Sequence, residues 1–194
     1  MVKQNRMNYH LILASNSPRR QELLKGLDWP FEVRVKTGID ETYPDDLPAK
    51  EVPLYLSKLK AKAYGAELQS NELLITADTI VIVDNKILGK PRNAADAKTM
   101  LALLSGRTHQ VVTGVSLTTQ HKQVAFKVTT DVTFKTLSQA EINYYVDTYK
   151  PFDKAGAYGV QEWIGYIGVT ALNGSYYNVM GLPVQRVYEE LQHF

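Results

Sequence analysis

The sequence contains no cysteine, which excludes disulfides, thiolate nucleophiles and zinc sites built on cysteine. It also has little excess charge, because 22 lysines and arginines face 20 aspartates and glutamates, leaving a net charge of +2. That balance argues against a broad nucleic-acid-binding or membrane-binding face. Any anion site must therefore be local, and its chemistry must come from carboxylates, hydroxyls, lysines, arginines or a metal.

Long apolar runs are missing as well. Nowhere do about 18 apolar residues follow one another, as a membrane-spanning helix requires. The amino-terminal stretch carries Lys3 and Arg6 but leads only into the short run 9–14, which is no signal-peptide core. These features predict a cytoplasmic protein without a membrane partner. At 194 residues and 44% hydrophobic content, the chain is expected to fold as a single domain over residues 1–194.

Strands and helices are expected to alternate along the chain, which predicts an α/β fold with a mixed sheet. The expected strands cover residues 9–14, 31–37, 73–83, 108–118, 124–134 and 164–172. The expected helices begin at Pro18, Ala49, Asn93, Ser138 and Pro183 and end near Asp28, Gln69, Leu104, Thr148 and the chain terminus. Their starts have physical signals, such as the pair Ser138 and Glu141, which is typical of a capping box. The Asp84-Asn85 pair predicts a hairpin turn after the third strand.

Lysines on two of these segments are candidate anion ligands. The helix expected over 49–69 would place its apolar stripe, at about 100° per residue, on Leu56, Leu59, Ala63 and Ala66. Lys60 lies nearer this stripe than the neighbouring lysines do. Lys90 lies on the constrained Gly89-Lys90-Pro91 loop. For each lysine, a solvated surface position is the alternative interpretation.

The turn formed by residues 15–20 is a candidate phosphate site. It joins a strand to a helix, where free amides and the positive end of the helix dipole favour an anion. Ser17 suits the N-cap and Pro18 the first helical position. Arg19 and Arg20 add bidentate donors. The alternative is an ordinary capped helix carrying two solvated arginines.

Acidic residues supply a second candidate. Asp78, followed by Thr79, interrupts the apolar strand 73–83, and a carboxylate there costs free energy unless a metal, a partner or a cleft receives it. A position at a sheet edge or bulge is the alternative. Glu41 follows Asp40 in a polar loop, where a solvated carboxylate is the simpler interpretation.

The run 153–161 is a third candidate, because it combines Asp153, Lys154 and Gln161 with two glycines that permit close backbone approach to a ligand. A long turn between a helix and a strand would look similar. Tyr144, Tyr145 and Tyr149 precede this run at helical intervals and are expected to pack rather than to stack on a base.

Taken together and in this order, these segments resemble the Maf-like nucleotide pyrophosphatases over nearly the whole chain. The matching motifs are Leu13-Ala14-Ser15-Asn16-Ser17-Pro18-Arg19-Arg20, Asp40-Glu41, Lys60-Ala61, Ala77-Asp78-Thr79, Gly89-Lys90-Pro91 and residues 153–161. The resemblance implies an ITPase-like fold, with a mixed twisted sheet flanked by helices and a deep central cleft between two lobes. It also implies hydrolysis of a nucleoside triphosphate between the α and β phosphates, with Mg²⁺ or Mn²⁺.

The resemblance also implies roles for individual residues. Asp78 would be the acidic catalytic residue, and Glu41 and Asp78 would hold the divalent cation. Asp153 and Lys154 would complete the wall of the pocket. The groups expected to bind phosphates are Ser15, Ser17, Arg20, Lys60 and Lys90. Water would attack the α phosphorus, with Asp78 either taking its proton or binding the metal that acidifies it.

Three positions indicate the substrate. Arg19, Thr79 and Gln161 match the branch that acts on dTTP and UTP, whereas a 7-methyl-GTP branch carries Trp, Gln and Glu there. The amide of Gln161 can both donate to and accept from the imide edge shared by uracil and thymine. Glu162 and Trp163 depart from the Gly-rich continuation common in the family, and this departure is expected to alter the rim of the base pocket.

Other functions remain open at this point. The same phosphate groups would serve a pyrophosphatase for modified or noncanonical nucleotides. A nucleotide-binding regulator of cell division is an alternative of another class, because the resembled family is associated with septum inhibition. The balanced charge argues against nucleic acid as a partner. A monomer and a homodimer are both compatible with the sequence.

Overall fold

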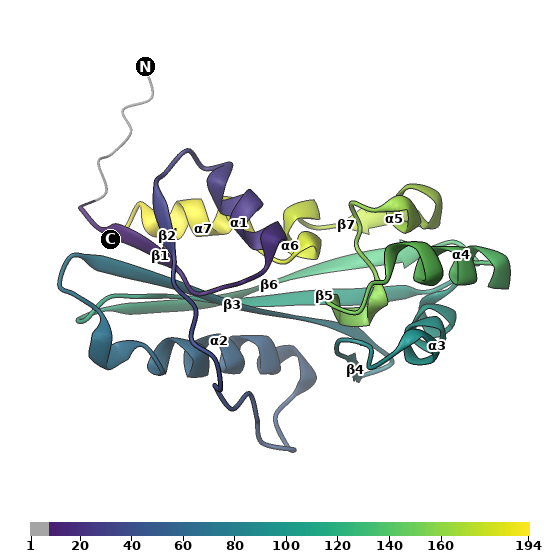
Figure 1. The fold of residues 1–194 in the computed structure, drawn as a ribbon, viewed down its shortest axis with the longest axis horizontal. Helices are drawn as coiled ribbons and strands as arrows, with labels where there is room; N and C mark the ends of the chain where they lie inside the picture. Colours follow the sequence, from purple (N-terminus) through teal and green to yellow (C-terminus); the bar gives the residue numbers. More distant parts are fainter. Residues whose placement is uncertain (1–7) are drawn as a thin grey trace. The chain divides into compact units, whose positions relative to one another are not determined.

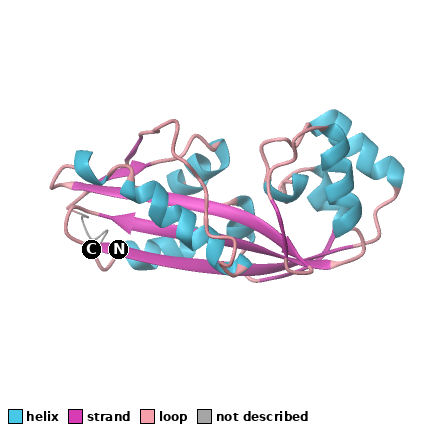
Figure 2. Ribbon diagram, turned by 90° about the horizontal axis from the view of Figure 1, so that it is seen from below, coloured by secondary structure: helices cyan, strands magenta, loops and turns pink. Residues whose placement is uncertain are grey.

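The computed structural model describes residues 8–194, and the stretch with Lys3 and Arg6, where no signal peptide is predicted, lies outside the described residues. Within that part, seven strands and seven α-helices alternate, with three short 3-10 helices between them (Figures 1 and 2). The predicted α/β class is confirmed. Among residues 8–194, no helix is long and apolar enough to cross a membrane.

The strands form one mixed sheet in the order β2-β1-β3-β5-β6-β7, with β4 paired to β3 off this path. Their bounds are β1 His10–Leu13, β2 Phe31–Val33, β3 Glu72–Val83, β4 Lys86–Leu88, β5 Thr108–Thr118, β6 Gln123–Phe134 and β7 Val169–Asn173. Strand β1 is parallel to β2 and β3, whereas β4 is antiparallel to β3 and β7 to β6. Both orientations occur together, as predicted.

Helices α1, α3 and α4 begin at the caps that the sequence signals. The α-helices are α1 Pro18–Lys25, α2 Val52–Lys62, α3 Ala94–Leu104, α4 Gln139–Tyr149, α5 Trp163–Gly168, α6 Tyr176–Met180 and α7 Val184–Leu191. The 3-10 helices are η1 Ala49–Glu51, η2 Gly65–Glu67 and η3 Ala155–Ala157. Ser17 caps α1 and Asn93 caps α3, each accepting a backbone N–H bond in the first turn. Both halves of the predicted Ser138–Glu141 capping box are present on α4. These caps satisfy amides that would otherwise lack partners.

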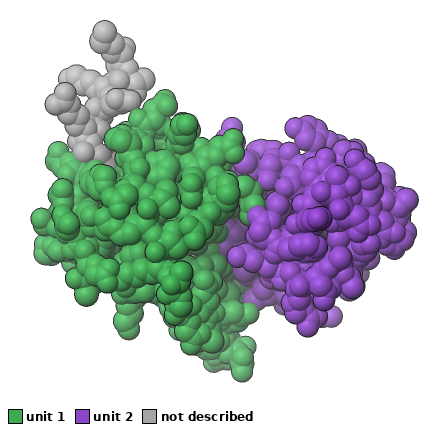
Figure 3. Space-filling model, in the orientation of Figure 1, with its two compact units in different colours: residues 1–78, 113–127, 181–194 green, residues 79–112, 128–180 purple. Residues whose placement is uncertain are grey.

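The chain divides into two compact units (Figure 3). Unit 1 comprises Met1–Asp78, of which 8–78 are described, with Thr113–Lys127 and Gly181–Phe194. Unit 2 comprises Thr79–Val112 and Val128–Met180. Strands β3, β5 and β6 contribute residues to both units, so the division does not test the predicted single domain over 1–194. That domain and the deep central cleft stay predictions.

Unit 1 has a small core around β1, β3 and α2. Buried Ile12 and Leu74 from the two strands pack with Ala61, Tyr64 and Leu68. In Figure 1, α2 lies on one side of these strands, and α1 and α7 lie on the other. The strands are therefore apolar on both faces, which fits their nearly continuous hydrophobic runs.

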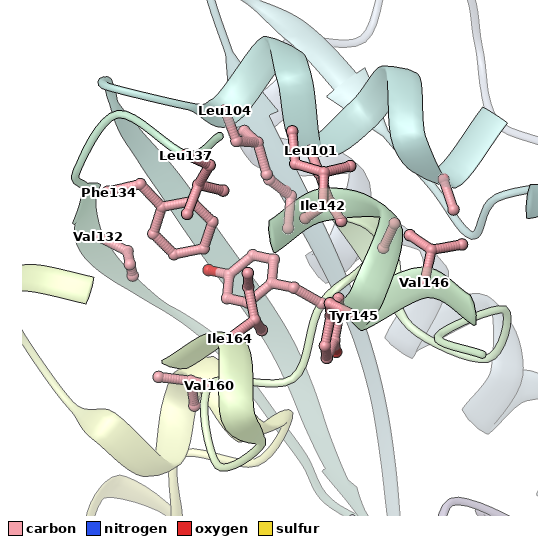
Figure 4. Packing of buried hydrophobic residues seen from close by; sticks show 14 of the residues in the cluster. Leu101, Leu104, Val132, Phe134, Leu137, Ile142, Tyr145, Val146, Val160 and Ile164 are labelled. Carbon is pink, nitrogen blue, oxygen red and sulfur yellow. The ribbon is translucent and has the colours of Figure 1, made fainter. Parts of the chain in front are cut away.

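Unit 2 has the larger core. Helix α3 packs against α4 and η3, and side chains from α3, α4, β6 and residues 157–164 point toward one another (Figure 4). Phe134 and Tyr145 are among the largest fully buried side chains of the chain. His109 adds a buried imidazole that hydrogen-bonds the Tyr158 hydroxyl at 2.7 Å. This core holds the 153–161 run in place.

The helix expected over residues 49–69 is wrong in its extent. Helix α2 ends at Lys62, and η1 and η2 flank it. The Tyr64 hydroxyl accepts from the Lys36 amide at 2.7 Å and donates to the Arg34 carbonyl at 3.2 Å, so Tyr64 is drawn into the core. Tertiary contacts thus override the helical period. Ala63 and Ala66, expected on the buried stripe, are exposed.

The structure differs from the predicted elements at three further places. The strand predicted over 164–172 begins only at Val169, because Trp163–Gly168 forms α5. A Cβ on Gly165 would lie 1.8 Å from the Val160 carbonyl oxygen, so glycine allows this turn to close. Helix α6 was not predicted, since five residues carry too little periodicity. Strand β2 ends at Val33 rather than at residue 37.

Candidate active site

The turn between β1 and α1 is built by two serines. Ser17 Oγ accepts the amide of Arg20 at 3.5 Å, and Ser15 Oγ accepts the amide of Ser17 at 3.2 Å. Pro18 fills the first helical position, as predicted. Each hydroxyl still carries a proton that it can donate to an anion. Arg19 lies in the first turn of α1, partly buried.

Arg20 is anchored by carbonyl groups from two other segments. Its Nε donates to the Gly181 carbonyl at 2.8 Å, and Nη1 donates to the Ala77 carbonyl at 2.9 Å. Burial lowers the pKa of the guanidinium, while the charges of Asp78 and Glu41 oppose that shift. The guanidinium therefore holds a partly buried positive charge next to Ala77, the residue before Asp78.

Lys60 lies between two carboxylates. Its ammonium nitrogen is 2.7 Å from Asp78 Oδ1 and 2.9 Å from Glu41 Oε2. The side chains of Lys60 and Asp78 are only 14% and 13% exposed, whereas Glu41 is 51% exposed. The structure thus brings together a helix residue, a strand residue and a loop residue that are far apart in the sequence. A buried pair of this kind attracts much more strongly than a solvated one.

The two carboxylates fit the ligand chemistry of a hard divalent cation. Mg²⁺ is commonly held by one or two carboxylates together with substrate phosphates. Asp78 and Glu41 both reach one ammonium, so their oxygens converge on one place. Among the described residues, no three histidine or acidic side chains gather to form a complete metal cage. The protein therefore offers a two-carboxylate site that a phosphate ligand would complete.

A buried polar seam fixes α2 against the sheet, and sequence reasoning missed it. Thr76 Oγ1 donates to the Ser57 carbonyl at 2.7 Å, and the hydroxyls of Ser57 and Ser116 bond at 2.9 Å. Thr76 and Asp78 share one face of β3, because side chains alternate along a strand. Ser57 and Lys60 lie one helical turn apart. The seam therefore sets the register in which Lys60 meets Asp78.

Gly114 on β5 permits this close packing. A Cβ at Gly114 would lie 2.3 Å from backbone atoms of Pro53 and Leu54 in α2. The glycine inside an apolar strand is the sequence signal of close backbone approach. It shows that α2 rests directly on the sheet backbone in unit 1.

In unit 2, Lys154 is bound by two carboxylates. Its ammonium is 2.8 Å from Asp153 Oδ1 and 3.0 Å from Glu162 Oε1. Lys154 is buried, whereas Asp153 is more than half exposed. Glu162 was expected only to alter a pocket rim, yet it is an internal ion-pair partner here. The predicted wall residues Asp153 and Lys154 do lie together.

Gln161 and Lys90 also belong to unit 2. The carbonyl oxygen Oε1 of Gln161 is buried and has no hydrogen-bond partner among the described residues. Lys90 is exposed, and the carbonyl of its neighbour Gly89 accepts the Gly156 amide at 3.1 Å. The Lys90 loop therefore contacts the 153–161 run. Thr79, partly buried, follows Asp78 on β3.

The predicted residues thus form two groups, each within one unit. The group in unit 1 is Ser15, Ser17, Arg19, Arg20, Glu41, Lys60 and Asp78. The group in unit 2 is Thr79, Lys90, Asp153, Lys154 and Gln161. The catalytic, phosphate-binding, metal-binding and specificity roles assigned to them stay predictions.

The fold is that of a known class of α/β proteins. The solved structure of the Ham1 protein from Staphylococcus aureus matches 94% of this chain and 99% of that chain, with a TM-score of 0.55. Only 17% of the residues are identical, so this likeness shows the fold alone.

The family is defined by the sequence. The family model described as "Maf-like protein" matches residues 10–194, and the chain belongs to this family. A relative from Parabacteroides distasonis is 57% identical over 98% of this chain and 99% of its own length. Another from Phocaeicola vulgatus is 58% identical over 97% and 98%. Both relatives are named dTTP/UTP pyrophosphatase. The resemblance inferred from the motifs is thereby confirmed.

Proposed function

We propose that this protein hydrolyses dTTP and UTP between the α and β phosphates, releasing the nucleoside monophosphate and pyrophosphate. The observation that carries the proposal is the cluster in which Lys60 joins Asp78 and Glu41 near partly buried Arg20. The two relatives named for this activity, at 57% and 58% identity, support it.

Cations and hydroxyls at the end of β1 suit the triphosphate. Arg20 and Lys60 would neutralise phosphate charge, and Ser15 and Ser17 would donate hydroxyl protons to phosphate oxygens. These groups are held before substrate arrives, because backbone carbonyls fix Arg20 and the α1 cap fixes Ser17. The family resemblance gives exposed Lys90 a phosphate-binding role as well.

Asp78 and Glu41 would hold Mg²⁺ or Mn²⁺. When bound, such an ion acts as a Lewis acid on phosphate oxygens and lowers the pKa of a water ligand. Asp78, whose Oδ1 lies 2.7 Å from the Lys60 ammonium, would either take the proton of the water that attacks the α phosphorus or hold the metal that acidifies this water. Lys60 would then stabilise charge on the departing pyrophosphate. Positioning and electrostatics account for most of the catalysis in phosphoryl transfer.

Gln161 would read the base. Its buried, unpartnered carbonyl oxygen suits the imide N–H of uracil or thymine, and its amide N–H groups suit a ring carbonyl. Cytosine has no imide N–H, so with the amide in this orientation its N3 acceptor would face the Gln161 oxygen and its 4-amino group would face the Gln161 N–H groups. Arg19 and Thr79 would complete the selection, and Asp153 and Lys154 would form the pocket wall. A nucleoside triphosphate substrate also implies that the protein works in the cytoplasm.

A nucleotide panel tests the proposal. Pyrophosphate release is followed with dTTP, UTP, CTP, GTP, 7-methyl-GTP and ITP in Mg²⁺, with Asp78→Asn as the matched control. We expect release from dTTP and UTP that Asp78→Asn abolishes. A preference for ITP or a modified nucleotide would favour the noncanonical substrate class. Binding of dTTP without turnover would favour the regulatory alternative.

A further inference from the structure

Glu162 is held at both of its carboxylate oxygens. Oε1 pairs with the Lys154 ammonium at 3.0 Å, and Oε2 accepts a hydrogen bond from the Tyr145 hydroxyl. Burial first, and then the Glu162 bond, raise the pKa of Tyr145, so its hydroxyl keeps the proton that it donates. The carboxylate thus joins α4, η3 and the start of α5.

The same contacts fix the turn that carries Gln161. The Gly159 amide donates to the Tyr145 hydroxyl oxygen at 3.0 Å. A Cβ on Gly159 would lie 2.9 Å from Glu162 Cδ and 3.0 Å from Gln161 Nε2. The two side chains therefore both lie against the bare backbone of Gly159. Removal of the Glu162 carboxylate would take away a side chain that lies next to the Gln161 amide. It would also leave the Tyr145 hydroxyl without the acceptor of its hydrogen bond.

The negative charge of Glu162 also holds the Lys154 ammonium in place. The Lys154 ammonium is buried and carries both Asp153 and Glu162 as partners, of which Glu162 is the less exposed. A buried cation with two carboxylates is a cross-link within unit 2 rather than an available phosphate ligand. Without Glu162, this cation would be drawn toward solvent or toward an incoming anion.

We infer that Glu162 is a positioning residue that, through Tyr145 and Gly159, holds the Gln161 amide in the orientation that reads the base. The inference rests on the proposed function, because it assigns Gln161 to base recognition. It also gives a role to the residue at which this sequence departs from the common family pattern.

The test compares Glu162→Ala and Glu162→Gln with Glu141→Gln as a matched control. Glu141 is another paired glutamate of unit 2, bonded to Lys135 and to the cap of α4. The ratio of kcat/KM for dTTP to that for CTP is measured for each protein. We expect Glu162→Ala to lower this ratio about tenfold, mostly through KM for dTTP. Glu162→Gln, which still accepts from Tyr145, should retain most of it, and Glu141→Gln all of it. An unchanged ratio in Glu162→Ala overturns the inference.

A second measurement needs no substrate. The side-chain amide resonances of Gln161, assigned by their loss in Gln161→Glu, should shift and broaden in Glu162→Ala and stay in place in Glu141→Gln. Unmoved resonances in Glu162→Ala would overturn the positioning role whatever nucleotide the enzyme uses. A wild-type protein that does not prefer dTTP over CTP would instead refute the proposed substrate, while these resonances would still decide the role of Glu162.

Discussion

Gly114→Ala should separate α2 from the sheet and disable the cluster at Lys60. The new Cβ would lie 2.3 Å from Leu54 N and from the Pro53 carbonyl carbon and oxygen. These are backbone atoms, so no side chain can rotate away to make room. Ordinary contacts for a Cβ begin at 3.4 Å, so α2 must retreat by about 1 Å. Gly114 has an ordinary backbone conformation, and the expected effect is therefore purely steric.

The magnitude follows from two costs. Overpacking a well-packed core typically costs about 1–3 kcal/mol, and a clash with backbone belongs at the upper end of that range. Replacing a strand glycine by alanine returns about 0.5–1 kcal/mol of backbone entropy. The net loss is about 2 kcal/mol, or about 4–8 °C in Tm for a protein of this size. A 1 Å shift of Lys60 from Asp78 should lower kcat by about 100-fold.

Thermal unfolding and pyrophosphate release measure these two effects. Gly65→Ala is the matched control, because a Cβ there meets nothing within 4 Å. It lies in the same unit, shortly after α2. We expect the control to keep wild-type activity and a Tm within about 2 °C of the wild type. A Gly114→Ala protein with unchanged Tm and kcat would refute the packing argument.

Three further predictions follow from single contacts. Lys60→Met should lower kcat/KM for dTTP about 100-fold in steady-state assays, because it removes a cation from phosphate and carboxylates; less than a threefold loss contradicts this. Gln161→Glu should cost about 100-fold on dTTP and UTP, since an ionised carboxylate cannot donate, and retained activity would count against base reading. Burial lowers the pKa of His109 from 6.5 to about 4. As the pH falls from 7 to 5, the unfolded chain therefore takes up a proton at His109 that the folded protein does not bind, and the free energy of unfolding decreases. Urea unfolding should show about 2 kcal/mol less stability at pH 5 than at pH 7, and His109→Gln should lose that difference; a variant that keeps it would contradict this assignment.

Local signals predicted the element starts well. Ser17, Asn93 and Ser138 cap helices through bonds to residues three positions on, so each cap can be seen in a few neighbouring letters. The Asp84-Asn85 turn likewise depends on two residues that tolerate positive φ, at 48° and 61°. These features need no knowledge of the rest of the chain.

Long-range contacts could not be predicted in the same way. The end of α2 at Lys62 depends on Tyr64, whose hydroxyl bonds to Arg34 and Lys36 in the segment after β2. The Gly114 contact with Leu54 joins residues about 60 positions apart. Periodicity carries no information about either partner. The motifs did indicate Lys60, Asp78 and Glu41 individually. The pairing of both carboxylates with the Lys60 ammonium arises only in the tertiary structure, because the three residues belong to different segments.

Hydrolysis of dTTP in water labelled with ¹⁸O tests the central claim most directly. Mass spectrometry of the products shows which phosphorus the water attacks and which bond breaks. The account predicts dTMP and pyrophosphate, with the heavy oxygen in dTMP, because water attacks the α phosphorus and pyrophosphate leaves. Products of dTDP and orthophosphate, or label in pyrophosphate, would contradict it.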